Sequence, residues 1–165
     1  MKVDVIHRED AATILQRNMP PSNECVYMCI GTENILSDSL GPRVGSLLQQ
    51  NMAKPMFVYG LCQSNINALN LLGAYSLIKV IHPDKKIVVI DAAVGSAEEV
   101  GTVQVLEGSL VPGAATNKNL PYVGDFSILG IVSMRGVKDF YVTNHDRQAL
   151  VEKMAQVIAT AISVV

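Results

Sequence analysis

The sequence predicts an α/β fold, a three-layer α/β/α sandwich around a mostly parallel sheet, formed by one domain over residues 1–165. Hydrophobic residues make up 49% of the chain and charged residues 17%, which is typical of a globular protein with a large core. Apolar segments of strand length alternate with segments of helical spacing through the first half, as in parallel sheets covered by helices. No repeat or linker indicates a second domain.

The first half of the chain alternates strictly between the two kinds of element. The segment at 25–30 is apolar on both faces, as in a central parallel strand. The next helix starts near Ser39, with Pro42 in its first turn, where proline is tolerated. Ser64 is the expected cap of a long helix that ends at His82-Pro83. The expected order is a helix at 9–18, a strand at 25–30, a helix at 39–52, a strand at 56–60, a helix at 64–81 and a strand at 86–90.

The helix at 64–81 has a broad apolar face, which we expect to lie against the sheet. Its members are Ile66, Leu69, Leu72, Ala74, Ile78 and Ile81.

In the second half the strands follow one another more closely. We expect strands at 102–106, 126–132 and 139–142, with a polar, glycine-containing loop at 108–120. A final helix, capped by Thr143 or Asn144, completes the sandwich.

Composition also excludes several kinds of partner. A net charge of −2 without clusters of Lys and Arg argues against nucleic acid or an anionic membrane. The apolar runs are too short to span a bilayer, and the charged first ten residues contain no signal-peptide segment. Three cysteines form neither a zinc spacing nor an even disulfide set. We therefore expect a cytoplasmic protein, and the oligomeric state is not predicted.

Two aspartates occupy equivalent places in this pattern. Asp38 lies in the loop after the strand at 25–30, and Asp91 directly follows the strand at 86–90. Both loops would open at the carboxyl edge of a parallel sheet, where such folds bind ligands. If the two strands are close, the carboxyl groups could share a proton and act as acid and base on water.

Other interpretations of these residues stay open. The two carboxylates could instead hold a divalent metal, although we expect no cofactor. Asp38 could be only a helix cap and Asp91 only a turn residue. Cys62 with His145 is a rival nucleophile and base. The segment from Gly31 to Gly45 matches no nucleotide-binding fingerprint.

Several segments resemble known proteins. Asp38-Ser39-Leu40-Gly41-Pro42 is similar to the D-A-L-G-P segment of the spore germination protease, an aspartic-type endopeptidase. Val89-Ile90-Asp91-Ala92 is similar to its second I-D-A segment, and Leu129-Gly130-Ile131-Val132 also matches. Pro112-Gly113 with Asn117-Lys118 is similar to its P-G…G-N-K loop. In length and detail the chain most resembles the YyaC family of sporulation proteins.

This resemblance implies a fold, a site and an activity. The fold is the phosphorylase/hydrolase-like sandwich, which hydrogenase maturation endopeptidases also have. Asp38 and Asp91 would be catalytic, matching two metal-contacting carboxylates in those endopeptidases, whose third ligand, a histidine, is missing from the loop around 108–113. The residues Gly31, Thr32, Asn34, Pro112, Gly113, Asn117 and Lys118 would bind substrate, partly through backbone amides. The resemblance thus implies a sporulation-associated peptidase with a protein or peptide substrate. The alternative is a catalytically inactive binding or assembly protein.

Overall fold

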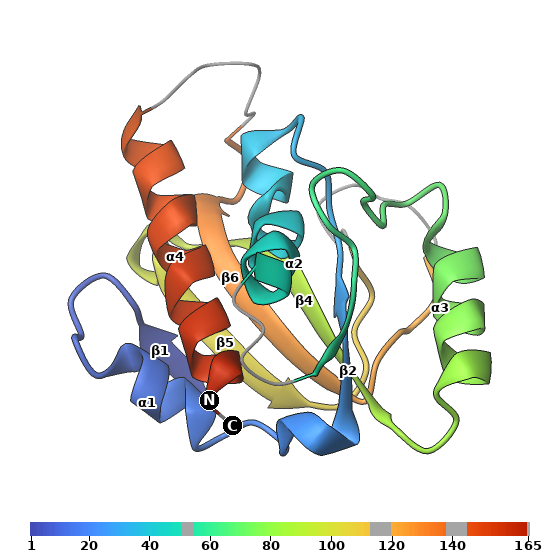
Figure 1. Ribbon diagram of the computed structural model, residues 1–165. Coiled ribbons are helices and arrows are strands. Elements are labelled where there is room, and N and C mark those ends of the chain that lie inside the picture. Colours follow the sequence, from blue (N-terminus) through green and yellow to red (C-terminus); the bar gives the residue numbers. More distant parts are fainter. Residues whose placement is uncertain (51–54, 113–119, 138–144, 165) are drawn as a thin grey trace.

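A computed structural model of the chain describes residues 1–50, 55–112, 120–137 and 145–164. Its six strands form one sheet in the order β1-β5-β6-β4-β2-β3 (Figure 1). The strands are β1 (Lys2–Asp4), β2 (Cys25–Cys29), β3 (Phe57–Tyr59), β4 (Lys86–Gly95), β5 (Thr102–Glu107) and β6 (Phe126–Met134). The helices are α1 (Ala11–Gln16), α2 (Leu40–Gln50), α3 (Leu71–Ile81) and α4 (His145–Ser163). Short 3-10 helices lie at Ser22–Glu24 (η1), Leu36–Asp38 (η2) and Ala97–Glu99 (η3).

The predicted α/β/α sandwich is confirmed. The β2–β3, β2–β4 and β4–β6 pairs are parallel, whereas β5 pairs antiparallel with both β1 and β6. In Figure 1, α1, α2 and α4 cover one face of the sheet, and α3 lies on the other side. The parallel half of the sheet, formed by β3, β2, β4 and β6, therefore carries the carboxyl edge at which the site was expected.

Side chains of the central strands alternate between two cores. Cys25, Tyr27 and Cys29 of β2 point into the larger core beneath α1, α2 and α4, while Val26 and Met28 point into the smaller one beneath α3. Both cysteines of β2 are free and buried, and burial raises their thiol pKa values, that of Cys25 to about 11. This two-sided burial explains why the segment reads as apolar throughout.

The strand β4 is longer than the sequence indicated. We expected it to end before Asp91, but it continues to Gly95 because β6 pairs with it as far as Met134. On its other side, pairing with β2 ends at Cys29–Ile90. Asp91 therefore lies inside β4, at the level where the shorter neighbouring strand stops.

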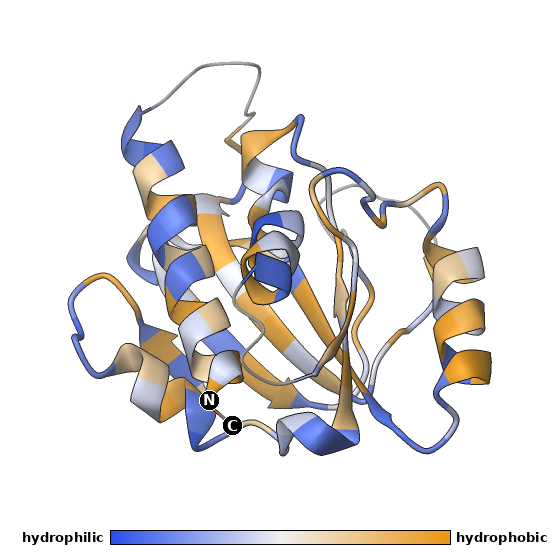
Figure 2. Cartoon of the chain, in the orientation of Figure 1, coloured by the Kyte–Doolittle hydropathy of each residue, from blue (hydrophilic) through white to orange (hydrophobic). Residues whose placement is uncertain are grey.

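The helix α3 is shorter than expected and presents a different face. It starts at Leu71 rather than after Ser64, because residues 61–70 form turns in which asparagine side chains bind backbone amides. Asn67 accepts from the Leu69 amide, and Asn70 accepts from the Asn67 amide. Leu69 and Leu72, which we expected to face the sheet, are 92% and 62% exposed. That prediction was wrong, and the outward surface of α3 is hydrophobic (Figure 2).

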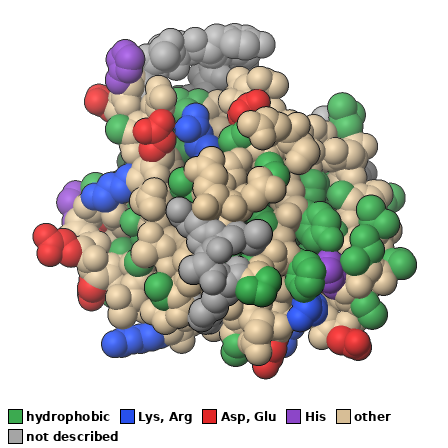
Figure 3. All heavy atoms as spheres, viewed as in Figure 1, with side chains coloured by type: hydrophobic (Ala, Val, Ile, Leu, Met, Phe, Trp, Pro, Cys, Tyr) green, Lys and Arg blue, Asp and Glu red, His purple; other side chains and the backbone are tan. Residues whose placement is uncertain are grey.

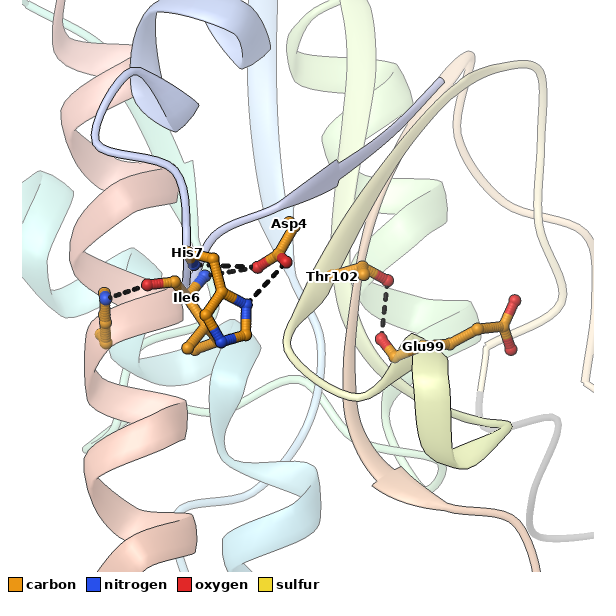
Figure 4. A network of polar contacts seen from close by, with 6 residues as sticks. Asp4, Ile6, His7, Glu99 and Thr102 are labelled. Atoms are coloured by element: carbon orange, nitrogen blue, oxygen red, sulfur yellow. Dashed lines mark hydrogen bonds and ion pairs between the residues drawn. The ribbon is translucent and has the colours of Figure 1, made fainter.

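The amino-terminal strand β1, which the sequence did not indicate, is tied down by polar contacts (Figure 4). Asp4 accepts from the backbone amides of Ile6 and His7, at 2.8 and 3.1 Å, and its other oxygen contacts His7 Nδ1 at 2.8 Å. Lys153 of α4 donates to the Ile6 carbonyl at 2.7 Å. These bonds hold the turn after β1 against α4.

Other expectations lie partly outside the described residues. These are the strand at 139–142, the cap of the last helix, and the end of the helix predicted to reach Met52. No helix within the described ranges has the length and hydropathy needed to cross a bilayer.

Candidate functional site

Asp38 is placed by a tight loop at the end of β2. Gly31 follows the strand, and its amide donates to the Ile66 carbonyl at 2.8 Å, while the Thr32 amide donates to the Asp38 carbonyl at 2.9 Å. A Cβ atom on Gly31 would lie 2.0 Å from that same Asp38 carbonyl, and Gly31 has φ of 132°, which L side chains rarely adopt. The loop can thus carry Asp38 back over the strand end only with glycine at position 31.

The start of α2 fixes the other side of this loop. Ser39 is fully buried, and its hydroxyl donates to the Leu36 carbonyl at 2.8 Å and accepts from Arg43 Nε at 3.1 Å. Gly41 packs directly on the residue after β2, because a Cβ there would meet the Ile30 carbonyl at 2.1 Å. This close packing holds η2 at the carboxyl edge.

Asp38 has an unusual protonation equilibrium. Burial raises the pKa of its carboxyl group from 3.8 to about 6, against the opposing effect of the Thr32 amide. The cause is loss of solvation, as in carboxyl groups that act as acids near neutral pH, rather than the charge of a neighbouring carboxylate. A carboxyl with a pKa near 6 can both accept and donate a proton at physiological pH.

Asp91 lies on β4, the strand next to β2. It is 3% exposed, and one of its carboxylate oxygens accepts from the Ala92 amide at 2.8 Å. The Ile30 amide donates to the Ile90 carbonyl at 2.8 Å, so Asp91 is the first residue of β4 beyond that last bond. A buried carboxylate at this point lies beside the residues from which the Asp38 loop departs.

The structure therefore places the Asp38 loop beside the strand that carries Asp91. The strands β2 and β4 are direct neighbours, and η2, which ends at Asp38, packs against β4. Both aspartates come from the carboxyl edge of the parallel half of the sheet, the usual place for a ligand site in such folds.

The donor set available for a metal is small. The described parts of the chain contain no group of three or more His, Cys, Asp or Glu side chains placed to hold a metal ion. Asp38 and Asp91 offer two carboxylates, fewer ligands than the two carboxylates and one histidine that the resemblance to hydrogenase maturation endopeptidases implies. The residues described do not fit that three-ligand centre.

The predicted substrate-binding residues fall into two groups. Gly31, Thr32 and Asn34 belong to the loop at the site, but their amides donate within the chain, to Ile66, Asp38 and the Thr32 hydroxyl. These amides therefore shape the loop instead of being available to a substrate. Pro112 is buried, and Gly113, Asn117 and Lys118 lie outside the described residues.

The rival pair Cys62 and His145 follows two strands that are not neighbours in the sheet. Cys62 follows β3 at the edge of the sheet, where its amide donates to Ser46 Oγ at 3.1 Å. His145 opens α4, which follows β6, and both β2 and β4 lie between β3 and β6. Two intervening strands put about 14 Å between the ends of β3 and β6, so the strands that precede Cys62 and His145 are not neighbours.

Sequence reasoning missed a cavity at the carboxyl end of β6. It has a volume of about 440 Å³. Its described lining is Ala97, Val100, Val132, Ser133, Met134, Val137, Asp146, Arg147 and Leu150. Because β6, η3 and α4 contribute residues far apart in the chain, no local motif could have indicated it. Neither Asp38 nor Asp91 lines this cavity.

The α/β/α sandwich defines the class of protein by fold. The structure is similar to that of HycI, a [NiFe] hydrogenase maturation protease from Thermococcus kodakarensis KOD1, with a TM-score of 0.58. The match covers 90% of this chain and 98% of HycI at 16% identity. This likeness establishes a shared fold, as the sequence resemblance implied.

The family is established from the sequence. The chain belongs to the family described as "Protein of unknown function (DUF1256)", whose model matches residues 3–161. It is 38% identical over 138 residues to the uncharacterized protein YyaC of Bacillus subtilis (strain 168), covering 84% of this chain and 67% of YyaC. The expected resemblance to YyaC is confirmed.

Proposed function

We propose that this protein is a peptide-bond hydrolase in which Asp38 and Asp91 activate water. The observation that carries the proposal is the half-buried carboxyl of Asp38, whose pKa of about 6 suits proton transfer near neutral pH. It lies at the carboxyl edge next to β4, the strand that carries Asp91. The fold shared with a maturation protease supports a peptidase role.

The chemistry follows from the different surroundings of the two carboxyl groups. Ionised Asp38 accepts a proton from a water molecule while the water oxygen attacks the peptide carbonyl carbon. The C–N bond then breaks as Asp38 gives this proton to the leaving amine. Asp91, held by the Ala92 amide, orients the water and the protonated Asp38. Proton transfer is complete within one cycle and needs no further reactant.

The substrate is proposed to be a protein or peptide, and the role one in sporulation. The support is the likeness of the segments around Asp38, Asp91 and Pro112 to the spore germination protease, together with the similarity of the chain to YyaC. The Thr32 and Asn34 side chains, with Pro112, Gly113, Asn117 and Lys118, are the proposed substrate contacts.

Cleavage of spore proteins tests this function. The purified chain is incubated with the acid-soluble protein fraction of Bacillus subtilis spores, and new peptide termini are identified by mass spectrometry. We expect cleavage by the wild type, with kcat/KM changing around pH 6. Asp38→Asn and Asp91→Asn should each lower it by about 10²-fold or more, because each removes part of the proton-transfer apparatus.

Asp84→Asn is the matched control, since Asp84 is an exposed aspartate between α3 and β4 at the opposite edge of the sheet. Equal turnover by the wild type and both site variants would reject the carboxylate mechanism. Binding of spore proteins without any cleavage would favour the alternative, a catalytically inactive binding or assembly protein. Chelation with EDTA distinguishes metal-dependent from metal-independent cleavage.

A further inference from the structure

The outward face of α3 and of the turn before it is an apolar stripe, defined here as Leu69, Leu72, Leu77, Val80 and Ile81. Their exposed fractions are 92%, 62%, 57%, 77% and 50%, respectively. Leu69, Leu72, Leu77 and Val80 recur every three to five residues, and Ile81 adjoins Val80. Together they form one side of the helix, opposite Leu71 and Ile78, which are buried against the sheet. Figure 3 shows hydrophobic side chains gathered at the right of the molecule, where Figure 1 places α3.

We propose that this stripe binds the same stripe on a second copy of the chain, forming a twofold dimer through an antiparallel pair of α3 helices. With about 150–200 Å² of surface for each such residue, the stripe exposes roughly 600 Å² per copy, or roughly 1,200 Å² for two. That reaches the lower limit of stable protein–protein interfaces, and Phe57, next to the helix end, is a further 47% exposed.

The stripe is complementary to itself. A twofold contact requires that residue i meets residue j and that j meets i. If the helices cross antiparallel near residue 75, Leu69 of one copy meets Ile81 and Val80 of the other. Leu77 then lies over Gly73 of the partner, where a Cβ atom would find nothing within 4 Å. A large side chain thus faces an open position, as close helix packing requires.

Charge also favours a second copy over other occupants. Lys79 is the only charged residue in α3, and its ammonium lies 5.4 Å from the centre of the Tyr75 ring. Two such faces meet without repulsion between like charges. An interfacial membrane helix would instead have several Lys or Arg residues along its polar side.

The contact would also reach the candidate site. Leu69 is three residues after Ile66, whose carbonyl accepts the hydrogen bond from Gly31. A partner seated on Leu69 would therefore hold the turn that supports the Asp38 loop.

Sedimentation velocity at micromolar concentration tests the dimer. We expect the wild type to sediment as a dimer and Leu77→Glu or Val80→Glu as a monomer, with association weakened by about 30-fold or more because a charge is buried in the contact. Leu106→Glu is the matched control, since Leu106 is 43% exposed on β5, away from α3, and should leave the dimer intact. A monomeric wild type, or equal effects of all three changes, would overturn the proposal.

A cross-link tests the geometry independently of any folding defect. Ser76 is exposed on the outer side of α3 near the proposed axis, so Ser76→Cys in a Cys62→Ser background should form a disulfide dimer on oxidation. Glu107→Cys in the same background should not. Absence of the Ser76→Cys cross-link, or binding of monomers to phosphatidylglycerol vesicles that Leu77→Glu abolishes, would assign the stripe elsewhere and refute the dimer.

Discussion

The two faces of the sheet differ in how completely helices cover them. Beneath α1, α2 and α4 lies a core in which leucine, methionine and isoleucine side chains are closed from solvent. Beneath α3 the core is smaller, and the helix itself presents hydrophobic residues outward. The comparison shows that apolar content alone does not identify a core. A helix can be hydrophobic all round while only one of its sides packs within the chain.

A pair of leucine truncations should show the difference most clearly. Leu40 on α2 is fully buried, so Leu40→Ala should lower the free energy of unfolding by about 2–5 kcal/mol. Leu72→Ala on α3 should change it by less than about 0.5 kcal/mol at concentrations where the chain is monomeric. Urea unfolding followed by circular dichroism measures both, and equal losses would contradict the comparison.

Two glycine substitutions test the same comparison between the two faces of the sheet at the level of the backbone. Gly31→Ala should cost about 1–3 kcal/mol and displace Asp38, because its Cβ would overlap the Asp38 carbonyl and its φ of 132° is unfavourable for alanine. Gly73→Ala, in the open side of α3, should instead stabilise the fold by about 0.5–1 kcal/mol through helix propensity. Thermal unfolding of the two variants gives the test. A stable Gly31→Ala protein with full peptidase activity would show that the loop tolerates a side chain.

The Asp38 carboxyl should make stability depend on pH. Its pKa is raised from 3.8 to about 6 in the folded state, so the folded chain holds the proton more tightly. Stability should therefore fall as pH rises from about 4 to 6. Asp38→Asn removes this effect and should stabilise the protein at pH 7 by about 1–3 kcal/mol, with little change at pH 4, after allowance for partial solvation. Denaturant unfolding at both pH values measures the difference, and destabilisation by Asp38→Asn at pH 7 would count against a raised pKa.

A small effect is also expected at the amino-terminal strand. The contact with His7 and the amides of His7 and Ile6 keep the pKa of Asp4 below its usual value, so its contribution is present above about pH 4 and is lost as pH falls further. The pair is exposed, and Asp4→Asn should cost no more than about 1 kcal/mol at pH 7. Thermal unfolding at pH 7 and pH 3 checks this, and an equal loss at both would exclude an ionised Asp4 as the cause.

Much of the fold could be predicted, because the information was local. Continuous apolar runs predicted β2 and the start of β4, and helical spacing with Pro42 predicted α2. The extension of β4 to Gly95 could not be predicted, since it depends on pairing with β6, more than thirty residues away. The predicted start of α3 was wrong, because local hydrogen bonds of the Asn67 and Asn70 side chains form turns where a helix was expected. The prediction that Leu69 and Leu72 face the sheet was wrong, because helical periodicity identifies a hydrophobic face but does not show what covers it.

The candidate site was predictable to a similar extent. Two aspartates after two parallel strands indicated the carboxyl edge, and the adjacency of β2 and β4 supports that interpretation. The raised pKa of Asp38 depends on burial by several elements, which no spacing reveals. The cavity beside β6 depends on three separate segments and was missed for the same reason.

The two buried thiols of β2 can report local opening of the protein, because they react with an alkylating reagent only after such opening. Cys25 and Cys29 are buried and, with their raised pKa values, protonated, so an alkylating reagent in solution finds neither access nor a thiolate. Cys62 is only half-buried. Slow labelling beyond the first thiol would therefore occur only when the central strand separates from its neighbours. The mass of the labelled chain, followed over time, would count these openings without any substitution in the sequence.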